Sequence, residues 1–368
     1  MNIPIYGLGH HLADDYNNAV LTITNRSCAD PYVIYAHGKF YMTWTAGNRV
    51  EIWCSPSLLN FEENCSKHNI WQPPHGKEYS GDIWAPELHA LQGRWYVYLA
   101  ADDPQHGNKS HRMYVLGGPP ASEDPCNGDW EMLGPVRNMP DQWAIDGTVI
   151  HLMGQMYFVY SGWPFEKQEG KNVQELFIVR LASPTETNSE AVRISTPENT
   201  WEWSGDAGIN EGPQWLAAPD GSWVGMAYSC AGSWTRDYKM ATLQFVGNDP
   251  LDPKAWKKSR EPLLQSADTA PFGPGHGSFI EMEGDFIGVY HGTDNATDGW
   301  GNRKARCQRV QFTEEGPHMG KFCGPLTTDA DVFRGIKQPP GHHVHVGGMK
   351  SFLRRASLKL ESIPKIEP

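Results

Sequence analysis

Short apolar runs separated by turn residues recur along most of the chain. The clearest runs start with a glycine and one polar residue and continue with aromatic or β-branched residues, a pattern typical of a strand that follows a tight turn. They begin at Gly38, Gly93, Gly154, Gly221 and Gly284, at intervals of about 60 residues. We interpret them as the second strands of five repeated units.

Each of these runs has apolar neighbours on both sides. A preceding run, expected as the first strand of a β-hairpin, lies at 32–35, 87–91, 148–150, 214–216 and 278–280. A following run, expected as a third strand, lies at 49–53, 111–115, 175–179, 239–243 and 305–312. The sequence therefore predicts antiparallel units of three or four strands.

A unit of this size cannot bury both of its faces alone, whereas radial stacking buries them against neighbouring units. Five copies predict an all-β fold, a five-bladed β-propeller, in a single domain over residues 1–368. The expected blades are 30–80, 81–140, 141–205, 206–268 and 269–345, with a tail at 346–368. The 38 glycines and 28 prolines are spread through the chain, which leaves little room for long helices. A β-sandwich or a pair of β domains is the alternative.

Composition and charge exclude several classes of function. The formal net charge of −12 repels phosphate backbones, so we expect no nucleic-acid partner. No apolar stretch approaches the roughly 20 residues of a membrane-spanning helix, so we expect no membrane association. The seven cysteines are scattered and odd in number, which argues against a disulfide framework.

The cellular location stays open at this stage. Residues 1–20 have neither a basic segment nor an apolar core, so they do not form a signal peptide. We expect a cytoplasmic protein if the natural chain starts at Met1, and a secreted one if a leader precedes that residue.

An ionisable residue stands at the start of every unit, just before its first strand. These residues are Asp30, Asp82 and Glu87 together, Asp146, Glu211 and His276. Because they share one phase within the repeat, we expect them at the same height around the axis, as a single cluster. Clustered acids raise one another's pKa, which suits acid/base work at a glycosidic bond.

Each residue also has a plainer interpretation. Asp30 before Pro31 and Asp146 before Gly147 fit ordinary turns, and His276 fits a buried imidazole with satisfied hydrogen bonds. The shared phase within the repeat favours the functional interpretation over these separate ones.

Several segments at these residues resemble glycoside hydrolase family 43, and within it the exo-acting α-L-arabinofuranosidases. The segments are ADPYVIYAHGKFYMTWT, IWAPELHALQGRWYVYLAA, DQWAIDGTVIHLMGQMYFVYSGW, INEGPQWL, AGSWTRDY and GPGHGSF. They run in order from about Asp30 to Phe312. The resemblance implies a five-bladed propeller and hydrolysis with inversion at the anomeric carbon.

The resemblance also assigns roles. Asp30 matches the general base, Glu211 the general acid, and Asp146 the carboxylate that modulates the pKa of the acid. His276 matches an axial histidine near a metal ion, often calcium, with water between them; no organic cofactor is implied. Inversion places the two reacting carboxyl groups about 6.5–9.5 Å apart.

Sugar contacts are expected from aromatic and charged residues beside the same loops. The candidates are Trp84, Glu87, Trp143, Trp163, Trp234, Arg303 and Arg306. A tryptophan in a β protein is as often a core residue as a sugar platform. One of the two arginines is expected to reach the acids, as an arginine does in the family, but the sequence does not indicate which.

The function expected from this resemblance is release of L-arabinose from the non-reducing ends of α-L-arabinofuranosyl chains, such as arabinan or arabinoxylan. The alternatives on the same fold are a β-D-xylosidase and an endo-α-1,5-arabinanase. A non-catalytic carbohydrate-binding propeller is more distant, because a lectin needs no trio of acids. We expect a monomer.

Overall fold

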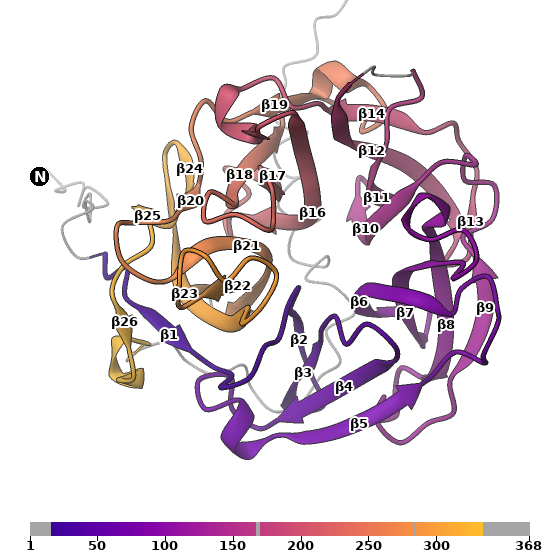
Figure 1. Ribbon diagram of the computed structural model, residues 1–368, viewed down its shortest axis with the longest axis horizontal. Coiled ribbons are helices and arrows are strands. Elements are labelled where there is room, and N and C mark those ends of the chain that lie inside the picture. The colour runs from indigo at the N-terminus through magenta and orange to yellow at the C-terminus, as the bar shows by residue number, and fades with distance from the viewer. Residues whose placement is uncertain (1–15, 167–169, 283–284, 334–368) are drawn as a thin grey trace, which may run out of the picture.

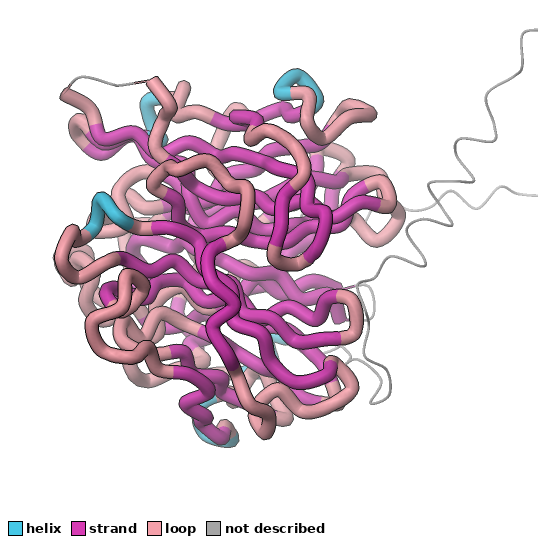
Figure 2. Tube along the Cα trace, turned by 90° about the vertical axis from the view of Figure 1, so that its right-hand side faces the viewer, coloured by secondary structure: helices cyan, strands magenta, loops and turns pink. Residues whose placement is uncertain are grey.

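The computed structural model describes residues 16–166, 170–282 and 285–333. Figure 2 shows that these residues form strands joined by loops. Helix among them is confined to 3₁₀ turns of three or four residues, such as Glu62–Asn64 and Thr200–Glu202. The prediction of an all-β fold is confirmed. Positions 334–345 of the fifth predicted blade and the predicted tail at 346–368 lie outside the described residues.

The five predicted hairpins are all present, each as an antiparallel pair. They pair β2 (Tyr32–Ala36) with β3 (Lys39–Thr43), β6 (Gly81–Leu91) with β7 (Arg94–Asp102), β10 (Ala144–Leu152) with β11 (Gln155–Gly162), β16 (Ala207–Ala217) with β17 (Val224–Cys230), and β21 (Phe272–Met282) with β22 (Asp285–Thr293).

Turn chemistry explains why the glycines mark these hairpins. In the second unit Gln92 and Gly93 both have positive φ, 49° and 82°, as a type I′ turn requires. His37–Gly38 and Met153–Gly154 repeat this arrangement in the first and third units. The turn glycine of the fifth unit, Gly284, lies outside the described residues.

The predicted third strands are also confirmed. They are β4 (Val50–Ser55), β8 (Arg112–Pro120), β12 (Asn172–Ser183), β18 (Lys239–Phe245) and β23 (Lys304–Thr313). Outer strands complete the units: β5 (Ser66–Trp71), β9 (Glu131–Pro135), β13 (Glu186–Thr187), β14 (Val192–Ser195), β19 (Trp256–Lys258), β20 (Leu264–Gln265) and β24 (Gly316–His318).

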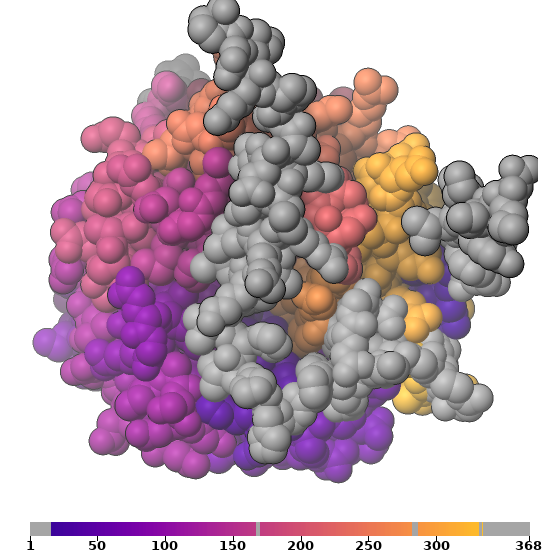
Figure 3. All heavy atoms as spheres, turned by 180° about the vertical axis from the view of Figure 1, so that it is seen from behind, coloured from indigo at the N-terminus to yellow at the C-terminus, as the bar shows by residue number. Residues whose placement is uncertain are grey.

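The units follow one another around a central region, with the first strand of each unit innermost (Figure 1). The third and fourth units share one sheet, because β12 pairs in parallel with β16 over three residues. The sequence left β1 (Val20–Thr22) outside every unit, yet it pairs with β23 of the last unit and with β26 (Leu326–Thr327). The two ends of the described chain therefore lie side by side, as Figure 3 also shows.

The hydrophobic core is divided among the interfaces between units. Each of five buried clusters draws its side chains mainly from two neighbouring units, and one of them joins Ile287 and Val289 of the last unit to Val33 and Trp53 of the first. Every unit thus buries both faces against a neighbour, as the sequence argument required.

Two further sequence expectations bear on the fold. All seven cysteines lie in the described ranges and are free. None of the helices in residues 16–333 that the structure describes is long and apolar enough to span a bilayer.

Phe158 of β11 provides a test of the interface packing. Its buried ring lies 5.3 Å from the ring of Tyr98 in the neighbouring unit. We expect Phe158→Ala to lower the free energy of unfolding by about 3–5 kcal/mol, because it leaves a cavity between two units. Urea denaturation measures this. Phe322→Ala, at a side chain that is 45% exposed, is the control and should change it by less than about 0.5 kcal/mol. Equal effects would contradict the assigned packing.

Candidate active site

The first strands of four units contain a β-bulge at the same place. The register shifts between residues 84 and 87 in β6, 145 and 148 in β10, 211 and 214 in β16, and 275 and 278 in β21. The first bulged residue has positive φ in each: Ala85 (42°), Asp146 (56°), Gly212 (53°) and His276 (50°). Bulges change the direction in which side chains point, and positive φ is strained for residues other than glycine. The repeated bulge therefore indicates positions with a functional role.

Asp30 has the same conformation just before β2, with φ of 55°. Asp30, Asp146 and His276 therefore share one phase, as predicted. Glu211 departs from it: it stands one residue earlier, and Gly212 takes the positive φ. In the second unit the equivalent bulge residue is Ala85, so Glu87 stands two residues after it, yet the charge of Glu87 still contributes to raising the pKa of Asp146.

Gly212 is required by a close approach as well as by its φ. A Cβ added there would stand 3.2–3.4 Å from atoms of the His276 ring. Its backbone N–H donates to Oδ2 of Asp146 over 3.0 Å. The residue after Glu211 thus ties the fourth unit to the acid of the third.

His276 brings the acids together. Its Nδ1 lies 3.3 Å from Oδ1 of Asp30 and 3.9 Å from Oδ2 of Asp146. The backbone N–H of His276 donates to Oγ of Ser229 at 2.7 Å, which holds the bulge. The structure therefore gathers the three predicted acids and the predicted histidine at one place on the inner strands.

Asp30 is surrounded by groups that favour its ionised form. Thr45 donates to its Oδ2 at 2.6 Å, while Nδ1 of His291 and Nη1 of Arg303 lie 3.2 and 3.6 Å from its Oδ1. Burial alone would raise its pKa, but the charges of His276 and Arg303 and the contact with His291 outweigh this effect. The pKa of Asp30 is held well below its usual range, so the residue is a carboxylate.

Glu211 has the opposite environment. Burial and the neighbouring charge of Asp146 raise its pKa to about 8, although the hydrogen bond from the Tyr238 hydroxyl to its Oε1, 2.7 Å, opposes the shift. Burial and the charge of Asp30 also raise the pKa of Asp146 well above its usual value. Glu211 therefore holds its proton at neutral pH.

Sequence reasoning did not single out three side chains that contact the acids. Thr45, Tyr238 and His291 come from the loop after β3, the loop before β18, and β22. The ring of His291 stacks on Tyr238 with 5.5 Å between centroids, and burial lowers the pKa of His291 to about 4. Tyr238 lies inside the AGSWTRDY segment, so a signal for it was present.

The structure distinguishes the two predicted arginines. Arg303 reaches Asp30. Arg306 is buried and directed elsewhere, with its Nη2 3.2 Å from the carbonyl oxygen of Gly292 and 2.6 Å from Oδ1 of Asp294.

Glu87 is buried, and both of its oxygens are engaged. Nε2 of His89 lies 2.9 Å from Oε2, and the amide of Gln214 donates to Oε1. Because Gln214 belongs to β16, this contact links the second unit to the fourth.

The predicted tryptophans differ in exposure. Trp143 is buried and stacks under Trp163 at 4.9 Å, which leaves Trp163 38% exposed. Trp84 stacks on His111 with centroids 4.0 Å apart. Trp234 is 40% exposed. Trp163 and Trp234 are therefore the two whose rings are most available to a ligand.

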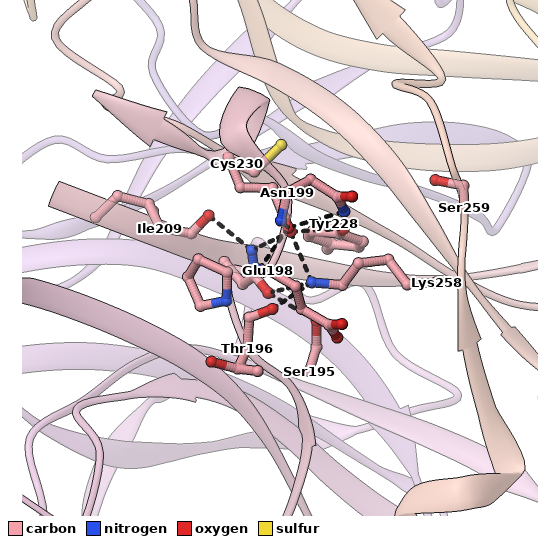
Figure 4. Close-up of polar contacts among 12 residues, drawn as sticks. Ser195, Thr196, Glu198, Asn199, Ile209, Tyr228, Cys230, Lys258 and Ser259 are labelled. Carbon is pink, nitrogen blue, oxygen red and sulfur yellow. Dashed lines mark hydrogen bonds and ion pairs between the residues drawn. The ribbon is translucent and has the colours of Figure 1, made fainter. Parts of the chain in front are cut away.

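A second layer of polar contacts supports the strand that carries Glu211. The buried carboxylate of Glu202 accepts from Nζ of Lys258 and from Nδ2 of Asn210, each at 2.7 Å. Lys258 also donates to the carbonyl oxygen of Thr196 (Figure 4). Because Asn210 precedes Glu211 in β16, this network fixes the backbone beside the acid.

The implied metal ion can be compared with these residues. Across 16–166, 170–282 and 285–333, no three His, Cys, Asp or Glu side chains are grouped so that they could hold a metal. Nδ1 of His276 lies against two carboxyl groups, so only its other ring nitrogen could face an ion or an intervening water molecule. A water-mediated ion beside His276 therefore stays a prediction.

Comparison with known proteins places this site in a class. A model of the family described as "Glycosyl hydrolases family 43" matches residues 16–317, most of the chain. The protein is therefore a glycoside hydrolase. More narrowly, the chain belongs to glycosyl hydrolases family 43, as the resemblance of its motifs indicated.

Individual relatives are more specific. An "Extracellular exo-alpha-(1->5)-L-arabinofuranosidase" of Streptomyces chartreusis is 31% identical over 270 residues, which are 70% of this chain and 77% of that protein. "Alpha-L-arabinofuranosidase 43" of Humicola insolens is 30% identical over 307 residues, 79% of this chain; the match spans only 61% of that longer protein. A solved α-L-arabinofuranosidase from Lactobacillus brevis has a TM-score of 0.73 and 29% identity and covers 82% of this chain and 96% of its own.

The raised pKa of Glu211 predicts how stability depends on pH. The folded protein holds this proton up to about pH 8, whereas the unfolded chain releases it near 4.5. Stability is therefore lost as the pH rises through this interval. We expect Glu211→Gln to remove that loss, so its Tm should fall less than that of the wild type between about pH 5 and about pH 8. Calorimetry measures this, with the exposed Glu315→Gln as the control. Parallel Tm profiles for all three proteins would contradict the assigned pKa.

Proposed function

We propose that the protein is an exo-acting, inverting α-L-arabinofuranosidase that releases L-arabinose from the non-reducing ends of arabinan and related chains. One observation carries the proposal: two carboxyl groups of one cluster have oppositely shifted pKa values. Asp30 is ionised and Glu211 is protonated at neutral pH. A base and an acid are what single-step inversion requires. The identity of the sugar, arabinofuranose, is inferred from the arabinofuranosidase relatives.

The fold part of the proposal is a five-bladed β-propeller that forms one catalytic domain. Five hairpin units and five clusters between neighbouring units support it. The pairing of β1 with β23 supports closure of the ring, since it fastens the first described strand to the last unit.

In the proposed reaction Asp30 takes a proton from a water molecule as that water attacks the anomeric carbon. Glu211 gives its proton to the glycosidic oxygen on the opposite face of the sugar, so the leaving group departs as an alcohol. Asp146 raises the pKa of Glu211 and, through the N–H of Gly212, orients the strand that carries it. The positive charges of His276 and Arg303 keep Asp30 ionised before the reaction.

The product pattern tests the exo assignment. We expect L-arabinose as the sole early product from linear α-1,5-linked arabino-oligosaccharides, followed by chromatography with time. Arabinobiose or arabinotriose as the dominant early products would favour an endo-arabinanase. Faster turnover of an aryl β-D-xyloside than of the aryl α-L-arabinofuranoside would favour a xylosidase.

The pH profile and two variants test the assigned roles. Because the base must be ionised and the acid protonated, kcat/KM should fall below the depressed pKa of Asp30 and above about pH 8, where Glu211 loses its proton. Asp30→Ala and Glu211→Ala should each lower kcat by at least about 10²-fold.

Tyr238→Phe sharpens this test. Removing the hydroxyl that stabilises the Glu211 carboxylate should move the alkaline limb of the profile to higher pH. A near-normal rate in either alanine variant, or an alkaline limb that moves to lower pH in Tyr238→Phe, would refute the corresponding role.

A further inference from the structure

Two exposed tryptophans, 66 positions apart in the chain, meet where two loops that lead to the candidate active site come together. Trp300 is 61% exposed, the highest value among the large hydrophobic side chains of the described residues, and Trp234 is 40% exposed. Their rings meet edge-on, with centroids 5.8 Å apart. Contiguous exposed apolar side chains are typical of ligand-binding surfaces.

The pair is held in place. Nε1 of Trp300 donates to Oγ of Ser233 at 3.1 Å, so the second loop is fastened to the first. The ring of Trp234 lies over Gly232, where an added Cβ would stand 2.7 Å from ring atoms. Neither tryptophan therefore needs to be ordered when a ligand arrives, which reduces the entropic cost of binding.

Both loops lead directly to reacting groups. The loop with Trp234 continues to Tyr238, whose hydroxyl donates to Glu211. The carbonyl oxygen of Trp300 accepts from Nε of Arg303 at 3.0 Å, and Arg303 contacts Asp30. The tryptophan pair is thus continuous with both the acid side and the base side of the site.

We propose that Trp234 and Trp300 form a platform for the leaving-group part of the substrate, the arabinofuranosyl units beyond the bond that is cleaved. This inference rests on the proposed exo action. An exo enzyme holds one terminal sugar next to its acids, so every other unit of the chain must lie outside, against the rim. Sugar rings present C–H faces that pack on aromatic rings, and an edge-to-face pair offers two surfaces to a bent furanoside chain.

The platform predicts a dependence on chain length. A linear arabinotetraose has three leaving-group sugars, whereas 4-nitrophenyl α-L-arabinofuranoside has none. For Trp300→Ala, the ratio of kcat/KM on arabinotetraose to kcat/KM on the aryl glycoside should fall by about 10-fold, mostly through KM. Ser233→Ala keeps the ring and removes only its hydrogen bond, so it should lower the same ratio by a smaller factor.

The matched control is Phe322→Ala, a similarly exposed aromatic side chain in β25 (Lys321–Phe322) on the outer part of the fourth unit. It should leave the ratio unchanged. An unchanged ratio in Trp300→Ala, or an equal loss in Phe322→Ala, would overturn the platform while leaving the proposed function intact. A wild-type protein that releases arabinose from neither substrate would overturn the proposed function, and the platform with it.

Discussion

The site depends on one backbone constraint, the left-handed conformation of one residue at or just before the innermost strand of a unit. A residue other than glycine costs on the order of 1–3 kcal/mol there, and Asp30, Asp146 and His276 all adopt it. Such strain persists only where the surrounding structure determines it. The hydrophobic clusters between units maintain the strained conformation, because each inner strand is held between two buried interfaces. The geometry of the acids is therefore a consequence of packing at the unit interfaces.

The same constraint separates the acids electrostatically. His276 lies between Asp30 and Asp146, but the guanidinium of Arg303 contacts Asp30 alone. Asp30 therefore receives most of the positive charge of the site, whereas burial raises the pKa of Asp146 and of Glu211, and the negative charge of Asp30 adds to both shifts. One buried cluster thus produces a carboxylate and a carboxylic acid at the same pH, because the cations are distributed unequally among otherwise similar groups.

The parts of this structure that could be predicted from the sequence are those with local signals. Each hairpin has its turn glycine and its apolar runs, and Asp30, Asp146 and His276 each stand eight residues before such a glycine. Glu211 stands ten residues before Gly221. One of the two extra residues comes from a longer hairpin turn, and the other arises because Gly212, not Glu211, takes the bulge position with positive φ. The pairing of β1 with β23 had no local signal, because β1 has only three residues and its partner strand lies near the other end of the described chain. Likewise, only the spatial arrangement shows that Arg303, and not Arg306, reaches the acid.

Two loops connect the proposed platform to the acid/base groups. Tyr238 and Trp234 share one loop, and Arg303 and Trp300 share the other, so a change in either loop moves a ring at the surface and a partner of an acid together. In contrast, the second layer around Glu202 and Lys258 contacts β16 at Asn210, the residue before Glu211, and reaches neither loop through these bonds. On the proposed platform, replacement of Trp300 or Trp234 alters the sugar contact alone, whereas a change in the length of either loop also displaces Tyr238 or Arg303.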